Sequence, residues 1–229
     1  KQFGIEQKLC GMKICTDACI LGAWTPTDNA QRILDIGTGT GLLSLMIAQR
    51  SEGTIEAVEI DPAAFQQASD NFSKSLWNNR LHLHHQSIQQ YMEKNQGKSF
   101  DLIISNPPFY TNHQQTNDYK RNRAHHDDEL PFEDLLRSMD LMLSQEGTAS
   151  ILLPPRQMDE FIKLAISFSF FPVQKLQISD NVQKPIIREV CLFKRQPSPI
   201  KIEELTIREE NGEYAPNYKK LLKDYLLIF

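Results

Sequence analysis

The sequence predicts an α/β fold in which helices flank a mostly parallel, Rossmann-like sheet of seven strands. Apolar residues alternate between the period of strands and the period of helices along most of the chain. A glycine-rich segment, residues 35–41, directly follows the first expected strand. The last two expected strands follow one another without a helix between them, which suits a seven-stranded sheet better than a six-stranded dinucleotide-binding one.

The individual elements follow from the same periodicity. The expected strands are residues 31–36, 54–60, 81–85, 100–105, 148–153, 173–179 and 186–194. The expected helices between them are residues 41–49, 62–71, 132–143 and 157–168. Pro62 suits the first turn of its helix, and Gly147 marks the expected end of the helix that starts at Phe132.

Length and composition indicate a single domain of residues 1–229. The chain has 40% hydrophobic and 24% charged residues, which is a normal balance for a globular protein with a full core. Pro197-Ser198-Pro199 marks a break before a C-terminal appendage, residues 197–229, which contains an expected helix at 218–226.

Several classes of protein are excluded by what the sequence lacks. No apolar run approaches the length that spans a bilayer, and the first residues do not form the apolar core of a signal peptide. The four cysteines (Cys10, Cys15, Cys19 and Cys191) form neither a CxxC pair nor a zinc-like quartet. We therefore expect buried thiols in a cytoplasmic protein without a metal site.

The glycine-rich segment has the pattern DxGxGxG. Gly37, Gly39 and Gly41 allow the backbone to turn sharply and to approach a ligand closely. The pattern begins with Asp35, whose carboxylate would repel a diphosphate but attract the ammonium of an amino-acid moiety. The loop therefore favours S-adenosylmethionine over a dinucleotide as the cofactor, with a purely structural turn as the alternative.

Polar side chains also follow the next two strands. Glu59 ends the second strand, where its carboxylate can accept hydrogen bonds from both hydroxyls of a ribose. Asp61 is expected to cap the next helix instead. Ser87 follows the third strand and is either a contact of the cofactor's adenine or the N-cap of the next helix.

The most informative segment is Asn106-Pro107-Pro108-Phe109, which follows the fourth strand. The lone pair of an exocyclic amine is delocalised into its ring, so the amine is a poor nucleophile. The Asn106 side-chain oxygen and the Pro107 carbonyl can accept its two N–H groups and free the lone pair. Pro107 and Pro108 stiffen the loop, and Phe109 offers a face for stacking a flipped base. A rigid structural turn is the alternative.

These motifs together resemble the class I methyltransferases that modify amino groups of adenine, guanine or glutamine. Residues 12–24, with Thr16-Asp17 and Leu21-Gly22-Ala23-Trp24, are similar to the MKV-x-TD-x-x-LLGAW element of the bacterial tRNA adenine-N6 methyltransferases that modify adenosine 37 of a valine tRNA. Residues 212–225 also resemble the C-terminal part of that family. The resemblance implies S-adenosylmethionine as cofactor and tRNA as substrate.

The resemblance also implies that residues 1–30 cover the cofactor, with Lys13, Thr16 and Asp17 among its contacts. Residues 19–21 are expected to lie on an amphipathic helix packed on the sheet. Two residues depart from the usual pattern: Cys15 stands where the family has Gly, and Ser87 where it often has Asp. Both departures concern cofactor binding and not the transfer step.

RNA contacts are expected beside the catalytic loop. The segment 119–126 combines an aromatic residue with Lys120, Arg121 and Arg123, which suits phosphate contacts and stacking. A solvated loop balanced by the acids that follow is the alternative. His82, His84 and His85 are interpreted as strand residues and not as metal ligands, because successive side chains of a strand point in opposite directions.

Three other functions remain open from the sequence. A protein-glutamine methyltransferase uses the same Asn-Pro-Pro loop, usually followed by Tyr, and a ribosomal RNA guanine-N2 methyltransferase also accepts the form with Phe109. A non-catalytic RNA-binding module of the same fold is the alternative from another class. The intact acidic loop, Glu59 and Asn106 argue against that module.

Overall fold

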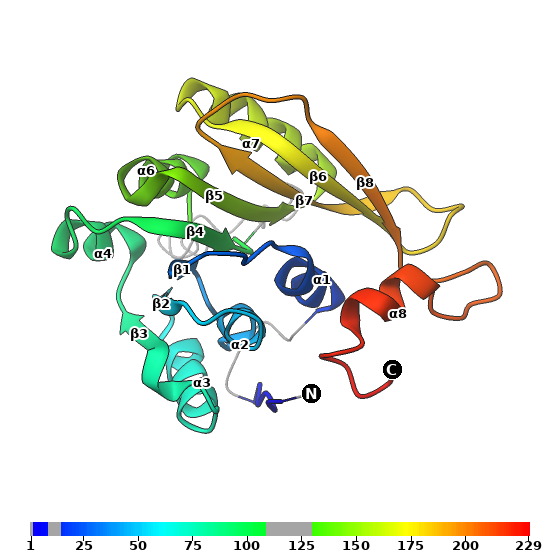
Figure 1. The fold of residues 1–229 in the computed structure, drawn as a ribbon, viewed down its shortest axis with the longest axis horizontal. Coiled ribbons are helices and arrows are strands. Elements are labelled where there is room, and N and C mark those ends of the chain that lie inside the picture. Colours follow the sequence, from blue (N-terminus) through cyan, green and yellow to red (C-terminus); the bar gives the residue numbers. More distant parts are fainter. Residues whose placement is uncertain (1, 9–14, 109–129) are drawn as a thin grey trace, which may run out of the picture.

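The computed structural model describes residues 2–8, 15–108 and 130–229. Its described part contains one sheet of eight strands in the order β3-β2-β1-β4-β5-β7-β6-β8 (Figure 1). Neighbouring strands are parallel, except that β7 is antiparallel to β5 and β6. The strands are β1 (Arg32–Ile36), β2 (Thr54–Glu59), β3 (Leu81–His85), β4 (Phe100–Ser105), β5 (Leu143–Leu153), β6 (Phe171–Ser179), β7 (Ile186–Lys194) and β8 (Lys201–Thr206).

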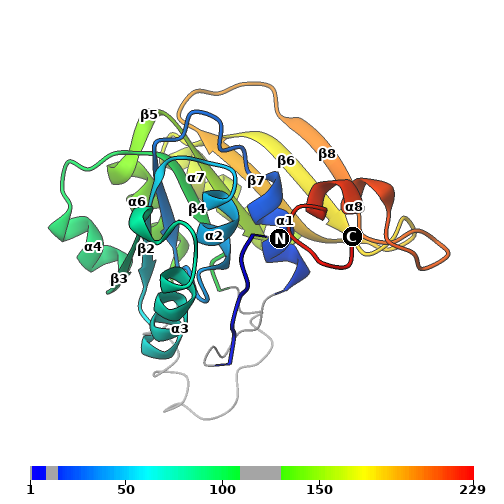
Figure 2. The same ribbon diagram turned by 60° about the horizontal axis from the view of Figure 1, so that its bottom comes forward.

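Helices cover both faces of this sheet, and each layer has its own buried cluster. One face carries α1 (Thr16–Trp24), α2 (Leu42–Ala48), α3 (Pro62–Ser73) and α8 (Pro216–Leu222), which lie below the sheet in Figure 1. The other face carries α4 (Ile88–Lys94), α6 (Phe132–Met142) and α7 (Pro155–Ser167). A short 3-10 turn, η1 (Asn78–Arg80), precedes β3. Figure 2 shows the N-terminal residues extended beside α3.

The predicted α/β class, with its mostly parallel sheet between helices, is confirmed, but the predicted strand number is one too low. The missed strand, β8, pairs in parallel with β6 and lies at the edge of the sheet. Most of its residues are exposed or half-buried, so it lacks the regular alternation that identifies a strand. Glu203 of β8 accepts hydrogen bonds from Trp24 Nε1 at the end of α1 and from Gln174 Nε2 of β6, both at 3.0 Å.

The prediction that a helix ends near Gly147 is wrong, because α6 ends at Met142 and β5 begins at the next residue. Arg195, just beyond β7, explains this direct junction. Its Nη2 lies 2.6 Å from the Asp140 carbonyl and 3.4 Å from the Leu143 carbonyl, and its Nη1 lies 3.0 Å from the Asp140 carboxylate. Arg195 thus satisfies carbonyls that the end of a helix leaves open. No local sequence pattern reports a partner that lies more than fifty residues away.

The helix expected around residues 19–21 is present as α1, although it is not amphipathic. All residues from Ala18 to Ala23 are buried, because α1 lies between the sheet, α2 and α8. Gly22 is needed in this packing, since a Cβ there would lie 2.8 Å from the Met46 sulfur on α2. The Leu-Gly-Ala-Trp element of the sequence is therefore explained by packing.

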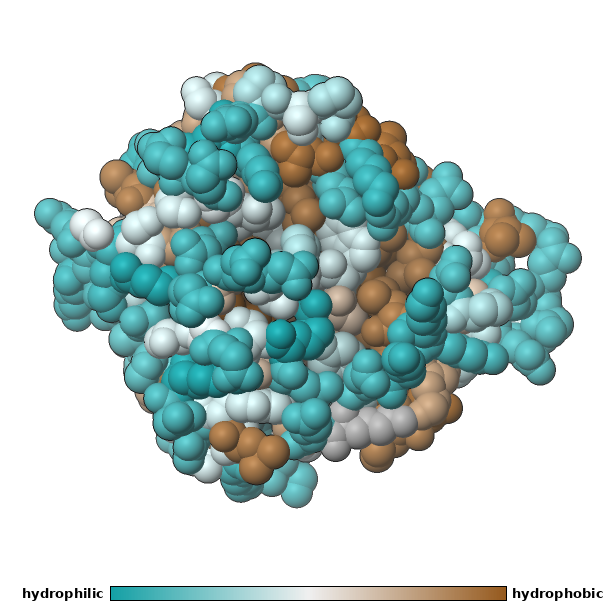
Figure 3. All heavy atoms as spheres, in the orientation of Figure 1, coloured by the Kyte–Doolittle hydropathy of each residue, from teal (hydrophilic) through white to brown (hydrophobic). Residues whose placement is uncertain are grey.

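The surface shown in Figure 3 is mostly hydrophilic, with apolar residues in small separate groups. The exposed large apolar side chains come from many elements and include Leu76, Leu141, Ile166 and Val182. Within the described residues, none of the helices has both the length and the apolar character needed to cross a membrane.

We expect Arg195→Met to lower the free energy of unfolding by about 1–3 kcal/mol, because the last carbonyls of α6 lose a charged donor in a half-buried place. Urea denaturation followed by circular dichroism measures this change. Arg156→Met is the matched control, because the Arg156 side chain is 78% exposed and its partner Glu160 is also exposed. Equal stability of the two variants would contradict the role given to Arg195.

Candidate functional site

Three loops meet at the carboxyl edge of the parallel strands. Ile36, the last residue of β1, is aligned with Val58 of β2 and with Ser105 of β4. The strands β2 and β4 are the two neighbours of β1. The chain adds β2 and β3 on one side of β1 and then crosses to add β4 and β5 on the other side, so the strand order changes direction at β1. Ligands of open α/β sheets bind at such a switch point. The register brings three predicted site residues to this edge: Gly37, Glu59 and Asn106.

The loop after β1 is held tightly by the end of β2. The backbone N–H groups of Gly37 and Thr38 both donate to the Val58 carbonyl, at 2.9 and 3.1 Å. Gly37, Gly39 and Gly41 all have positive φ, between 58° and 82°. A Cβ added at Gly37 or Gly39 would meet nothing within 4 Å, so these two positions face open space that a ligand can enter.

Asp35 lies beneath this loop and is fully buried. Its Oδ2 accepts hydrogen bonds from Thr38 Oγ1, Ser44 Oγ and Ser44 N–H, at 2.6, 2.7 and 3.1 Å. Its Oδ1 is buried without a hydrogen-bond donor among the described residues. Burial raises the pKa of the Asp35 carboxyl from 3.8 to about 6, and the hydrogen bonds from Ser44 and Thr38 limit that rise. A buried carboxylate oxygen that lacks a donor fits a cationic ligand group.

Glu59 is 8% exposed and faces the same loop. Its Oε2 accepts the Gly39 N–H at 2.7 Å and its Oε1 accepts the Asp61 N–H at 2.9 Å. Each carboxylate oxygen has a second lone pair, so both retain capacity for ligand hydroxyls. Asp61 caps α3 as predicted, because its Oδ1 accepts the Ala64 N–H at 2.7 Å.

A cavity of about 290 Å³ opens beside Glu59. Ser87 lines it and is also the N-cap of α4, in a capping box with Gln90. The capping interpretation of Ser87 is thus confirmed, and the adenine contact stays a prediction. Sequence reasoning missed the apolar walls of this cavity, which come from the ends of β1 and β2, the start of α4 and the segment before α6: Ile36, Val58, Ile60, Ile88 and Leu130.

Asn106 follows β4 and is half-buried, while Pro107 is buried. The Asn106 Oδ1 atom is itself buried and finds no donor among the described residues. A buried amide oxygen without a partner costs free energy, so this oxygen is suited to a donor that a substrate brings.

The predicted contacts near α1 lie close to the same edge. Thr16 is exposed at the start of α1, and the Asp17 carboxylate lies 2.8 Å from the Arg188 Nε of β7. Sequence reasoning missed Arg188, because only the antiparallel course of β7 brings its first residues beside the end of β5. Five predicted residues lie outside the described part of the chain: Lys13, Phe109, Lys120, Arg121 and Arg123.

Two of the β3 histidines, His84 and His85, have separate surroundings. His84 contacts Glu56, whose pKa is lowered to about 2 by its hydrogen bond with His84 and by Lys98, against the effect of burial. His85 stacks on Phe65 with ring centroids 4.7 Å apart. Within the described ranges, no three His, Cys, Asp or Glu side chains are grouped so that they could hold a metal ion.

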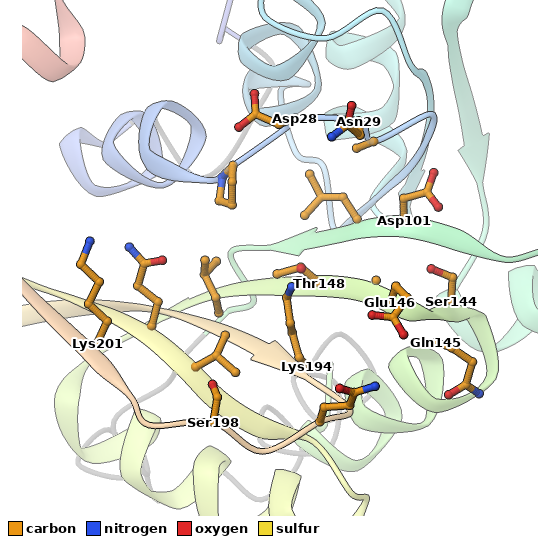
Figure 4. Close-up of a pocket in the computed structure, with 18 of the residues that line it drawn as sticks. Asp28, Asn29, Asp101, Ser144, Gln145, Glu146, Thr148, Lys194, Ser198 and Lys201 are labelled. Atoms are coloured by element: carbon orange, nitrogen blue, oxygen red, sulfur yellow. The ribbon is translucent and has the colours of Figure 1, made fainter.

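A larger hollow, about 790 Å³, lies at the opposite edge of the sheet, where the parallel strands begin. Figure 4 shows Asp28 and Asn29 on one side of it and Lys194 and Lys201 on the other. It contains none of the predicted site residues, and its side chains carry charges of both signs. We therefore assign the functional site to the carboxyl edge.

Comparisons with known proteins find related methyltransferases. The methyltransferase small domain family matches residues 17–125. A tRNA1(Val) (adenine(37)-N6)-methyltransferase of Flavobacterium psychrophilum is 37% identical over 99% of this chain and 97% of its own length. The protein of the same description from Dyadobacter fermentans is 39% identical over 100% of this chain and 96% of its own.

Two solved structures share the fold. A predicted O-methyltransferase from Agrobacterium tumefaciens has a TM-score of 0.68 and 20% identity, over 91% of this chain and 96% of its own. A methyltransferase from Pyrococcus furiosus has a TM-score of 0.62 and 18% identity, over 85% of this chain and 90% of its own. The expected class I methyltransferase fold is confirmed.

We expect Asp35→Asn to become more stable relative to the native chain as pH rises from 4 to 7. The usual pKa of this carboxyl is 3.8, and burial raises its pKa to about 6 in the folded chain, so the native chain loses stability as pH rises through this window. Asn has no proton to lose, and the difference should grow by about 2 kcal/mol between pH 4 and pH 7.

Urea denaturation at both pH values measures this difference, with the exposed Asp159→Asn as control. If Asp35→Asn and the native chain differ in stability by the same amount at pH 4 and pH 7, burial does not disfavour the Asp35 charge.

Proposed function

Because this chain belongs to the family of tRNA1(Val) (adenine(37)-N6)-methyltransferases, we propose that it transfers a methyl group from S-adenosylmethionine to N6 of an adenine in tRNA. The observation that carries the proposal is the buried Asn106 Oδ1 without a donor, next to the glycine loop on the same edge of the sheet. We take adenosine 37 of a valine tRNA as the target, as in the names of the relatives.

The residues at the carboxyl edge fit S-adenosylmethionine. Asp35 Oδ1 would accept the ammonium of its methionine moiety, and the open space over Gly37 and Gly39 would admit the ligand close to the backbone. Glu59 would accept the two ribose hydroxyls. The apolar cavity beside Glu59 would take the adenine ring between the side chains of β2 and α4. Lys13, Thr16, Asp17 and Ser87 remain proposed contacts.

The transfer step needs an amine whose lone pair is free. When bound, S-adenosylmethionine supplies a methyl group activated by its sulfonium. Asn106 Oδ1 and the Pro107 carbonyl would accept the two N–H groups of the target amine and hold its lone pair toward that methyl group. The buried place of Asn106 Oδ1 strengthens this interaction, because water does not compete for the oxygen. The nitrogen would form its bond to the methyl group as the bond between that methyl group and the sulfonium sulfur breaks, which leaves a neutral thioether, and the nitrogen would then release one proton to solvent.

The tRNA would approach over the same edge. We propose that Phe109 stacks on the flipped adenine and that Lys120, Arg121 and Arg123 contact phosphates. Base flipping into a pocket at the strand ends suits an anticodon loop, whose bases are already unpaired.

We expect unmodified tRNA to accept label from S-adenosylmethionine and to yield N6-methyladenosine after nucleoside digestion and mass spectrometry. Mapping should place the product at position 37 of a valine tRNA, as the names of the relatives imply. If label appears in ribosomal RNA or in a release factor and none appears in tRNA, the proposed transfer chemistry stands and the proposed tRNA substrate is wrong. Binding of tRNA without binding of S-adenosylmethionine would favour a non-catalytic module.

Asn106→Ala should abolish transfer and leave the affinity for S-adenosylmethionine within about threefold, because its oxygen serves the target amine. Isothermal titration gives the affinity and labelled transfer gives the rate. Asn79→Ala, at an exposed position before β3 and so near the opposite edge, is the control and should retain full activity. Loss of cofactor binding in the Asn106 variant would assign that residue to the cofactor and not to the amine.

A further inference from the structure

Asn71 of α3 joins three segments that are far apart in the sequence. Its Oδ1 accepts the Glu6 N–H at 3.0 Å, and its Nδ2 donates to the Glu6 carbonyl at 2.9 Å. The same Nδ2 donates to the Thr40 carbonyl in the glycine loop at 2.8 Å. Asn71 is only 2% exposed, and its bond to the Thr40 carbonyl is buried, whereas its two bonds to the exposed Glu6 are partly buried. One carboxamide thus connects the N-terminal segment, α3 and the loop.

The Thr40 carbonyl lies just before α2, whose N-cap is Gly41, so this carbonyl accepts no hydrogen bond within the helix. Asn71 Nδ2 supplies a donor to it. The Ser44 N–H, in the first turn of α2, has no partner within the helix either and donates to Asp35 Oδ2 at 3.1 Å. Side chains from two other elements, Asp35 of β1 and Asn71 of α3, therefore hold the end of the glycine loop and the start of α2.

The loop is held at three successive residues. Glu59 accepts the N–H of Gly39, Asn71 donates to the carbonyl of Thr40, and the Phe72 ring packs against Gly41. A Cβ at Gly41 would lie 2.4 Å from that ring. The adjacent residues Asn71 and Phe72 thus support the second half of the loop, while Gly37 and Gly39 face open space.

The N-terminal segment is attached to α3 and the turn after it by further contacts. Lys74 lies 2.7 Å from the Glu6 carboxylate, although both side chains are more than half exposed. Phe3 packs edge-on against Trp77 with ring centroids 5.9 Å apart. In Figure 2 this segment runs beside α3. The bonds between Asn71 and Glu6 are partly buried and involve only backbone groups of Glu6.

We propose that Asn71 is a positioning residue for cofactor binding, which sets the glycine loop in its ligand-ready shape by joining the Thr40 carbonyl to the N-terminal segment. The proposal rests on the proposed function for the identity of the cofactor. Asn71 does not line the cavity beside Glu59, so it would act through Thr40 and its neighbours. Its loss should weaken cofactor affinity without slowing transfer at saturation.

The test compares Asn71→Leu, which keeps the volume, with Glu6→Ala, which keeps the backbone groups that Asn71 contacts and loses only the exposed ion pair. We expect Asn71→Leu to bind S-adenosylmethionine about tenfold more weakly by isothermal titration, with kcat within about twofold. In the ligand-free protein, amide hydrogen exchange at Gly39, Gly41 and Ser44 should accelerate about tenfold. Glu6→Ala should match the native chain in all three measurements.

Asn71→Asp keeps the acceptor for the Glu6 N–H and loses the two N–H donors to the Glu6 and Thr40 carbonyls. It replaces Asn71→Leu in the test if that variant does not fold. Unchanged affinity and exchange in the Asp variant would overturn the proposal, as would a loss of kcat with affinity intact. If the native chain itself does not bind S-adenosylmethionine, the proposed function fails. The exchange measurement on the ligand-free protein would still decide whether Asn71 holds the loop.

Discussion

The parallel register of β1 with β2 and β4 is the constraint on which the site depends. It aligns Ile36 with Val58 and Ser105, so that the glycine loop, Glu59 and Asn106 leave the sheet at one edge. A shift of one residue would turn the buried side chains of β1 to the other face of the sheet, and both closely packed layers would then have to repack. Precise placement of ligand-binding loops is thus a consequence of core packing.

The site is built mainly from acceptors. Asp35 Oδ1 and Asn106 Oδ1 are both buried without a donor among the described residues, and Glu59 adds a nearly buried carboxylate. The groups proposed to bind there are all donors: an ammonium, two ribose hydroxyls and an exocyclic amine. Unsatisfied acceptors cost free energy in the ligand-free protein. The raised pKa of Asp35 reflects part of this cost, because burial disfavours its charged form. Ligand binding relieves it.

The residues that carried the family resemblance have two different physical roles. Gly22 and Trp24 pack α1 against α2 and β8, and Arg50 Nη2 donates to the Gly22 and Thr25 carbonyls, both at 2.7 Å. Asp17 instead pairs with Arg188 at the carboxyl edge, near the proposed ligand. A single short motif therefore combines packing at one end of a helix with a charged contact at the other.

Periodicity alone determined the strands around the site, because their apolar residues form regular local patterns, and glycine spacing identified the loop between β1 and α2. The tertiary structure decided the rest. The edge strand β8 is too exposed to show a pattern, and the end of α6 depends on Arg195, which comes after β7. Asn71 is an ordinary helix residue in the sequence, yet its carboxamide binds Glu6 and Thr40. Local patterns report burial and turns, whereas hydrogen bonds between distant segments exist only once the chain has folded.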